Sequence, residues 1–251
     1  MKLAELEARM RRGEYFHGLR VPDGMFAVLR VDGRSFSRLT ERICEKPFDP
    51  KFHEWMTATA KALLVSLHGR YAYTESDEIS VLLPREAGLF DREVEKLVSI
   101  AAGSASANMS LLLGEVVEFD ARIWIGARRG DVVDYFRWRQ SDATRCALNG
   151  HCYWALRKEG KSVSEASRAL VGMSVSRKNE LLFARGINFN EVPAWQRRGS
   201  GVYWDSVVKM GKNPKTGEKI KIPATIVPRF TAGAGFKAKV ATGKAKKVVK
   251  K

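Results

Sequence analysis

Two short apolar runs in the sequence lead into acidic residues that could bind a metal ion. The first run, residues 26–31, leads into Asp32, which Gly33 follows directly. Because glycine lets the backbone turn sharply and lets another group approach closely, Asp32 and the neighbouring carbonyl could face one ligand. Oxygen ligands of this kind suit Mg²⁺, and the alternative is an Asp-Gly turn without a ligand.

The second acidic stretch comprises Glu75, Ser76, Asp77 and Glu78, between two segments that are typical of β-strands. Charges packed into the middle of a strand pair are costly unless they bind something. In one continuous strand Glu75 and Asp77 would share a face and Ser76 and Glu78 the other, so only part of the cluster could join Asp32. We expect Asp77 to do so; the alternative is a hairpin turn with solvated acids.

Composition indicates a folded chain with a polyanionic partner. Its 251 residues are 45% hydrophobic, which is enough for a core, and 44 basic against 28 acidic residues give a net charge of +16, which favours nucleic acid as the partner. Three cysteines and four histidines show neither a disulfide framework nor a zinc pattern, so a reducing cytoplasm is expected. His53 and His68 lie off the apolar stripe of residues 52–67 and are expected to be solvated. No run suggests a membrane span or a signal peptide.

Hydrophobic periodicity predicts the elements that would position the acids. Between residues 25 and 125 it indicates strand, helix, strand, strand, helix and strand, with the first long helix capped by Asp49. This order is the ferredoxin-like split arrangement, an α+β fold in which two helices back an antiparallel sheet. Asp32 and the Ser76-Asp77-Glu78 corner would then lie on neighbouring strands. A palm-type nucleotidyltransferase needs such a pair to hold two Mg²⁺ ions about 3.5–4 Å apart.

The second half of the chain predicts surfaces that could bind RNA. A long helix follows residue 130, and Arg139, Asp142 and Arg145 share one polar face of it. That face could contact tRNA or simply be a solvated, salt-bridged surface. Arg197 and Arg198 belong to a basic, glycine-rich turn that could touch RNA phosphates or close a hairpin.

The C-terminal end is rich in lysine. A hairpin is predicted at residues 209–221, and the tail beyond it, which includes Lys237 and Lys239, carries no acid. We expect this tail to add salt-sensitive affinity for nucleic acid. The predicted organisation is a palm catalytic domain at 1–130, a helical and hairpin region at 131–235 that completes the same catalytic unit, and a basic mobile tail at 236–251.

Six ordered motifs between residues 25 and 204 resemble the tRNA-histidine guanylyltransferase family. They are Arg30-Val31-Asp32-Gly33-Arg34-Ser35-Phe36, Lys46-Pro47, Ser76-Asp77-Glu78, Phe119-Asp120-Ala121-Arg122, Trp138-Arg139-Gln140-Ser141-Asp142 and Lys178-Asn179-Glu180-Leu181-Leu182-Phe183. The resemblance implies a polymerase-type palm that extends RNA in the 3′-to-5′ direction. ATP activates a tRNA 5′-monophosphate, or a 5′-triphosphate end is used, and the 3′-hydroxyl of an incoming nucleotide attacks. It also implies a tetramer.

The resemblance implies roles for individual residues. Asp32, Asp77 and the Gly33 carbonyl would bind the two Mg²⁺ ions, and Glu78 would border the site as a further catalytic residue. ATP, GTP or another nucleoside triphosphate would contact Arg34, Ser35, Phe36, Lys46, Ser76, Lys96, Lys178 and Asn179. The candidates for tRNA binding are Arg139, Arg145, Arg197, Arg198, Lys237 and Lys239.

The chain departs from the family pattern after Asp142. Eukaryotic members continue with Cys-His-Ile-Asn-Asn-Leu-Tyr-Asn, whereas this chain has Ala-Thr-Arg-Cys-Ala-Leu-Asn-Gly at 143–150. The missing histidine and asparagines are associated with non-templated guanosine addition to histidine tRNA. The pattern is more similar to bacterial and archaeal guanylyltransferase-like proteins, which restore missing 5′ nucleotides by base pairing. Template-dependent repair of tRNA 5′ ends is therefore the main prediction, and non-templated guanosine addition is the alternative. A nucleotide cyclase and a non-catalytic RNA-binding scaffold are rival hypotheses.

Overall fold

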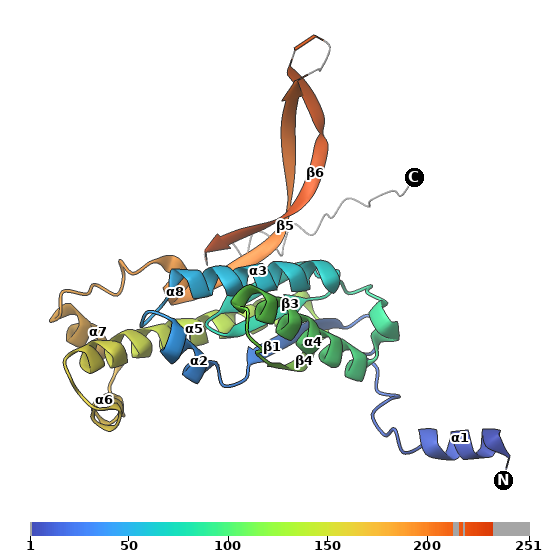
Figure 1. Cartoon of the computed structure of the whole chain (residues 1–251), viewed down its shortest axis with the longest axis horizontal. Helices are drawn as coiled ribbons and strands as arrows, with labels where there is room; N and C mark the ends of the chain where they lie inside the picture. The colour runs from blue at the N-terminus through green and yellow to red at the C-terminus, as the bar shows by residue number, and fades with distance from the viewer. Residues whose placement is uncertain (1, 213–215, 218, 233–251) are drawn as a thin grey trace.

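The computed structural model describes residues 2–212, 216–217 and 219–232. Its centre is a six-stranded sheet in the order β4-β1-β3-β2-β5-β6, in which neighbouring strands are antiparallel (Figure 1). The strands are β1 (Phe26–Gly33), β2 (Tyr71–Glu75), β3 (Glu78–Leu82), β4 (Phe119–Gly126), β5 (Ser200–Lys212) and β6 (Lys219–Ala232). The first four strands follow the ferredoxin-like order, so the predicted α+β fold class is confirmed.

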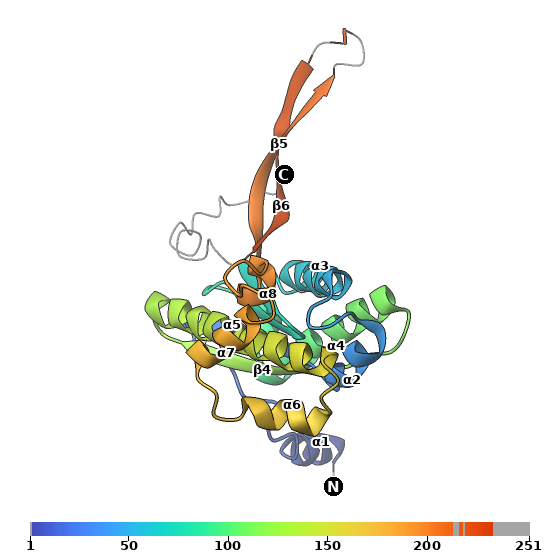
Figure 2. The ribbon, with the colours of Figure 1, turned by 90° about the vertical axis from the view of Figure 1, so that its left-hand side faces the viewer.

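Helices cover both faces of this sheet (Figures 1 and 2). The helix that the Asp49 cap predicts is present, because the Asp49 carboxylate accepts hydrogen bonds from the first turn. The helical segments are α1 (Leu3–Arg11), α2 (Phe36–Ile43), α3 (Pro50–Ser66), the short 3₁₀ helix η1 (Leu89–Arg92), α4 (Val94–Leu113), α5 (Arg129–Lys158), α6 (Val163–Leu170), α7 (Val175–Phe183) and α8 (Ala194–Arg198).

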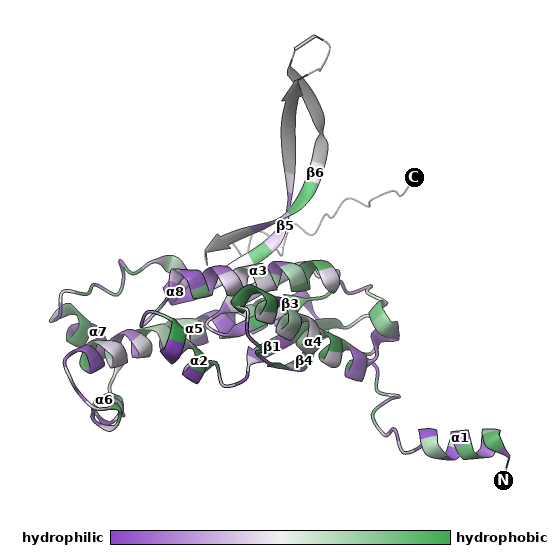
Figure 3. Ribbon diagram, viewed as in Figure 1, coloured by the Kyte–Doolittle hydropathy of each residue, from purple (hydrophilic) through white to green (hydrophobic). Residues whose placement is uncertain are grey.

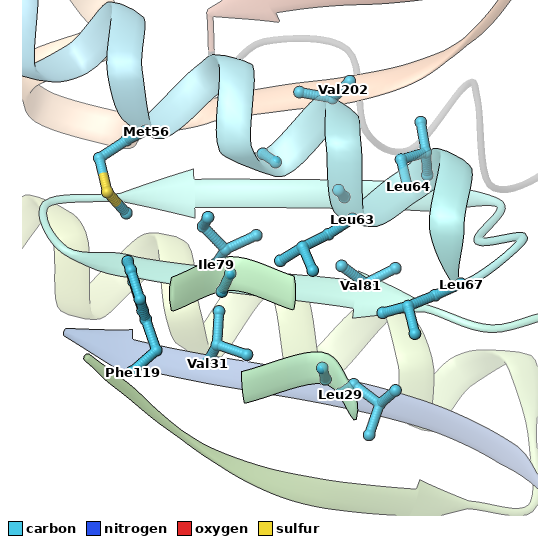
Figure 4. Close-up of a cluster of buried hydrophobic side chains, with 14 of the residues drawn as sticks. Leu29, Val31, Met56, Leu63, Leu64, Leu67, Ile79, Val81, Phe119 and Val202 are labelled. Carbon is cyan, nitrogen blue, oxygen red and sulfur yellow. The ribbon is translucent and has the colours of Figure 1, made fainter. Parts of the chain in front are cut away.

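The main core lies between the sheet and the helices α3 and α4. Alternate residues of each strand point to one face, so Leu29 and Val31 of β1 and Ile79 of β3 meet Leu63 from α3 (Figure 4). All four side chains are at most 1% exposed. This core holds the end of β1 rigidly, which matters because Asp32 follows Val31.

The opposite face of the sheet packs against α5, which the sequence did not predict to lie there. Val28 and Tyr71 from the strands form a second apolar cluster with Val132 and Phe136 from α5. Because this cluster covers only part of the face, the remaining part, at the Asp32 end, is available to polar side chains.

The chain after α5 extends two parts of the structure, the C-terminal half of α5 and the edge of the sheet at β2. A third cluster, which includes Leu148, Cys152 and Leu182, packs α6 and α7 against the C-terminal half of α5. β5 joins the sheet beside β2 through residues 200–203, and then continues with β6 as a ribbon that projects from the body (Figures 1 and 2). The hairpin predicted at 209–221 is the outer part of this longer ribbon.

One helix in the described part of the chain, α4, is long and apolar enough to cross a membrane by length and composition (Figure 3). Its residues Leu97, Ala101, Ala105 and Met109 are buried in the main core. A core helix passes the same compositional test, and α4 packs against α3 and the sheet with 22% of its apolar stretch buried.

Candidate active site

Asp32 and Asp77 lie together at one end of the sheet. Asp32 is the second-last residue of β1, and Asp77 lies in the two-residue turn between β2 and β3. The Gly33 N–H donates a hydrogen bond to the Asp77 carbonyl at 3.1 Å, which fixes the end of β1 against the turn. The structure therefore brings together the two aspartates that the sequence singles out.

The turn at Ser76 and Asp77 replaces the continuous strand considered from the sequence. Ser76 has φ = +46°, a backbone conformation that residues other than glycine, asparagine and aspartate seldom adopt. Glu75 and Glu78 are consequently cross-strand partners. The hairpin alternative is thus correct for the backbone, but its acids are not solvated, because Glu78 is only 6% exposed.

Close packing explains the glycine after Asp32. A Cβ atom on Gly33 would lie 2.4 Å from the ring of Phe36, far inside contact distance. Phe36 is 2% exposed and packs edge-to-face on Phe119, with ring centroids 4.9 Å apart. The role predicted for Phe36 in lining a nucleotide pocket is therefore wrong, since its ring has no surface to offer. Arg34 and Ser35 are exposed, and Arg34 forms an ion pair with Glu118.

Asp32 and Asp77 repel each other at this poorly solvated end of the sheet, which we call the corner. Burial raises the pKa of the Asp77 carboxyl, and the nearby charge of Asp32 raises this pKa further. A cation between the carboxylates would relieve this repulsion. The described residues contain no group of three His, Cys, Asp or Glu side chains suited to a metal. Two carboxylates with a backbone carbonyl therefore fit Mg²⁺ only if water or substrate phosphates complete its shell, which is how Mg²⁺ is commonly bound.

Lys46 approaches the same corner from the loop between α2 and α3. Its Nζ donates a hydrogen bond to Thr40 Oγ1 at 2.6 Å and lies 5.7 Å from the centre of the Trp154 ring. Burial lowers the pKa of Lys46, while nearby acids, Asp77 among them, raise it. The structure thus places one cation within electrostatic reach of Asp77, as a triphosphate site would require.

A pocket of about 90 Å³ opens beside Lys46 and Ser76. One wall is aromatic, because the His53 and Trp195 rings stack with centroids 4.4 Å apart. The sequence prediction that His53 is solvated is wrong, since it did not foresee that α8 would bring Trp195 onto it. No sequence signal identified Trp195 as a pocket residue, because its partner lies on α3, more than a hundred positions away.

We expect His53 to make the folded protein less stable in mild acid. Burial lowers the pKa of His53 from 6.5 to about 4. As pH falls from about 6.5 towards about 4, His53 becomes protonated in the unfolded chain but stays neutral in the folded chain. Protonation therefore favours the unfolded chain, and the folded protein loses stability over this pH range. Because His53 is partly exposed, we expect the free energy of unfolding to fall by about 2 kcal/mol.

Denaturant unfolding of wild type and His53→Gln at about pH 7 and about pH 4.5 tests this. The wild type should lose more stability than His53→Gln. The matched control is His68→Asn, because His68 is exposed and asparagine tolerates its φ of +49°. Equal losses in wild type and His53→Gln would contradict the expectation.

Arg139 is buried, contrary to the exposed face predicted for it. It is 6% exposed, and its guanidinium donates to both oxygens of Glu78, at 2.8 and 2.7 Å, and to Glu75 at 3.0 Å. An arginine held in this way has no free surface for RNA, so its assignment as a tRNA contact is corrected. Glu78 lies beside the aspartates, but both of its oxygens are engaged, which argues against a direct catalytic role.

Three other predicted nucleotide contacts lie away from the corner. Lys96 lies in the first turn of α4, and its Nζ pairs with Glu93 at 3.1 Å. The first residue of this helix, Val94, donates its N–H to the carbonyl of Leu19, which precedes β1 in the chain. This is the opposite end of β1 from Asp32, so a single chain does not bring Lys96 to the site. Lys178 and Asn179 lie on α7, which packs against α5, and neither lines the pocket.

The remaining basic candidates differ in exposure. Arg145 and Arg198 are exposed, whereas Arg197 is half-buried and its Nε donates to the Val192 carbonyl at 2.7 Å. The predicted turn that carries Arg197 and Arg198 is the short helix α8. Lys237 and Lys239 lie outside the described residues, as does the rest of the predicted tail, and tRNA binding by the exposed arginines stays a prediction.

Comparisons with known proteins agree with this geometry. A family model described as tRNAHis guanylyltransferase matches residues 7–127, and one described as the Thg1 C-terminal domain matches residues 130–247. A probable tRNA(His) guanylyltransferase from Dictyostelium discoideum is 32% identical over 79% of this chain and 84% of its own length. The chain belongs to the tRNA(His) guanylyltransferase family. Members of this family are nucleotidyltransferases, and this chain is one of them.

Two further family members extend the comparison. The tRNA(His) guanylyltransferase of Debaryomyces hansenii is 34% identical, over 72% of this chain and 73% of its own length. A solved bacterial tRNA(His) guanylyltransferase-like protein, in complex with ATP, superposes with a TM-score of 0.69 at 26% identity, covering 79% of this chain and 88% of the other. The resemblance stated from the six motifs is therefore confirmed.

Proposed function

We propose that this protein transfers a nucleotide to the 5′ end of tRNA, and that guanosine addition to histidine tRNA is its main reaction. The observation that carries the proposal is the corner of Asp32 and Asp77, two neighbouring carboxylates on a palm-like sheet. The family membership supports tRNA as substrate, since the relatives reported above are named tRNA(His) guanylyltransferases. This reverses the order of the two activities expected from the sequence.

Asp32, Asp77 and the Gly33 carbonyl would hold the metal. Two Mg²⁺ ions bound there would supply activation of the attacking hydroxyl and stabilisation of charge on the leaving phosphate. Around them, Lys46 would pair with phosphate oxygens through its partly buried ammonium, and Ser76 would donate from the rim. The aromatic wall of His53 and Trp195 would face a nucleobase, for which stacking is a favourable contact.

We also propose that residues 1–130 and 131–235 form one catalytic unit, as predicted from the sequence. Arg139 of α5 contacts the acidic turn, and Trp195 of α8 lines the pocket, so the second region supplies side chains to a corner that the first region builds. The expected tetramer and the cytoplasmic location stay predictions.

Template-dependent repair is the second candidate, and the sequence of α5 favours it. Thr144 stands where the eukaryotic pattern has histidine, and its hydroxyl donates to the Arg197 carbonyl at 2.9 Å. Ala147, at the second asparagine position, is 1% exposed. Neither residue offers the donors that histidine and asparagine would present to RNA.

The test compares guanosine transfer to full-length histidine tRNA with transfer of the pairing nucleotide to several tRNAs that lack their first nucleotide. We expect kcat/KM to be at least about tenfold higher for histidine tRNA. The opposite ranking, with the nucleotide chosen by base pairing, would replace the main proposal with repair. No transfer to any of these RNAs would refute both.

A further inference from the structure

Five carboxylates crowd the corner, but they are not equivalent. They are Asp32, Asp77, Glu75, Glu78 and Asp142. Glu78 lies directly across from Asp32 in the β1–β3 register and directly across from Glu75 in the β2–β3 register. Residues opposite one another on antiparallel strands share a face, with Cβ atoms about 4.5–5.5 Å apart, and like charges in such pairs repel. The fifth, Asp142, reaches the corner from α5.

Arg139 separates these carboxylates into two groups. It forms ion pairs with Glu78 at 2.7 Å, Glu75 at 3.0 Å and Asp142 at 3.2 Å. Among the residues that the structure describes, Asp32 and Asp77 take part in no ion pair within salt-bridge distance. The corner therefore has three carboxylates that form ion pairs with Arg139 and two that do not.

The Arg139 guanidinium is also held by an aromatic ring, and its partner Glu78 has a second arginine nearby. It lies over the Trp138 ring, 4.6 Å from its centroid, and the same ring lies 5.8 Å from the guanidinium carbon of Arg30. Arg30 also approaches Glu78, with 3.6 Å between Nε and Oε2. Because the Arg139 fork and the Glu78 carboxylate are both about 8% exposed, the pair cannot exchange its partners for water without a large structural change.

We propose that Arg139 is a positioning residue that withdraws Glu78 and Glu75 from the set of metal ligands, so that Asp32 and Asp77 are the only carboxylates that hold the catalytic cations. This inference rests on the proposed function. Without Arg139, Glu78 would keep only the 3.6 Å contact with Arg30, and its carboxylate beside Asp32 would be available to the same cation. A hard cation binds more tightly as carboxylates are added, but it would then sit away from the position that nucleotidyl transfer requires.

The experiment measures metal binding and catalysis separately. Mn²⁺ binding is followed by electron paramagnetic resonance on the full-length protein, and kcat is measured at saturating metal with histidine tRNA and GTP. The variants are Arg139→Gln, Arg139→Gln with Glu78→Gln, and Arg139→Lys. The matched control is Arg137→Gln, an exposed arginine on the same helix that pairs only with Asp134 among the described residues.

We expect Arg139→Gln to bind Mn²⁺ about tenfold more tightly while kcat falls at least about tenfold, because the added ligand misplaces the cation. Adding Glu78→Gln should return the Mn²⁺ affinity to within about threefold of wild type. Arg137→Gln should match wild type in both readouts. If Arg139→Gln does not fold, Arg139→Lys decides. Lysine lacks the planar fork whose two nitrogens bind the two Glu78 oxygens side by side, so tighter Mn²⁺ binding is again expected.

Two results would overturn this inference. Unchanged Mn²⁺ affinity with weakened tRNA binding would make Arg139 an RNA contact, and parallel loss of Mn²⁺ affinity and kcat would make it a general structural residue. Failure of the wild type to bind Mn²⁺ or to transfer a nucleotide would instead refute the proposed function, so the two failures are distinguishable.

Discussion

Replacing Asp77 with asparagine is expected to lower the rate of nucleotide addition to tRNA by at least about a thousandfold, and Asp32→Asn should have the same effect. Each substitution removes a negatively charged oxygen ligand without changing side-chain size. Stability should be unchanged or higher, because each variant removes one of two like charges in a poorly solvated corner. Single-turnover assays give the rate, and thermal unfolding and filter binding report the fold and the tRNA affinity.

The matched control for these variants is Asp134→Asn. Asp134 is an exposed aspartate on α5 that pairs with Arg137 at 2.9 Å, away from the turn. It should keep wild-type rates, because its loss changes only a surface ion pair. Residual activity above about one tenth of wild type in either Asp32→Asn or Asp77→Asn would show that the corner does not hold the catalytic metal.

The second large effect is expected at Lys46. Lys46→Met keeps the apolar stem but removes the ammonium that lies near Asp77 and at the pocket. A charge-assisted hydrogen bond to phosphate contributes about 1.5–3 kcal/mol, so nucleotide affinity should fall about 10- to 100-fold. Equilibrium titration with a fluorescent GTP analogue measures this affinity directly.

Lys51→Met is the control for Lys46. Lys51 is exposed in the first turn of α3 and lies over the Trp55 ring, 5.1 Å from its centroid. It should bind the analogue as wild type does. If Lys46→Met also retained wild-type affinity, the pocket beside it would not be the nucleotide site.

The fold could be predicted from sequence because its signals are local. The alternation that buries Leu29 and Val31, the Asp49 cap and the apolar repeat of α3 each lie within a few neighbouring residues. The ferredoxin-like order follows from the sequence of such elements. The pairing of Asp32 with the acidic turn then follows from the topology, because β1 and β3 are neighbours in this arrangement.

The rest depended on contacts between distant segments. Arg139 looks like part of a solvated helix face because its partners, Glu75 and Glu78, precede it by more than sixty positions. His53 looks exposed for the same reason, since α8 brings Trp195 onto it. Phe36 follows the predicted metal-binding motif closely, yet its ring turns into the core and packs on Phe119. The hydrophobic periodicity of one helix or strand does not show which distant segment will pack against its polar face.

The most direct test of the central assignment is the fate of radiolabelled GTP incubated with the protein, Mg²⁺, tRNA and ATP, which would activate the 5′-monophosphate of the tRNA. Transfer by the Asp32 and Asp77 corner predicts label on the 5′ end of the RNA, dependent on Mg²⁺ and absent with Asp77→Asn. Label recovered as a cyclic nucleotide would make the protein a cyclase. Label that stays on GTP while tRNA is bound would make it an RNA-binding scaffold, and either result would contradict nucleotidyl transfer to tRNA.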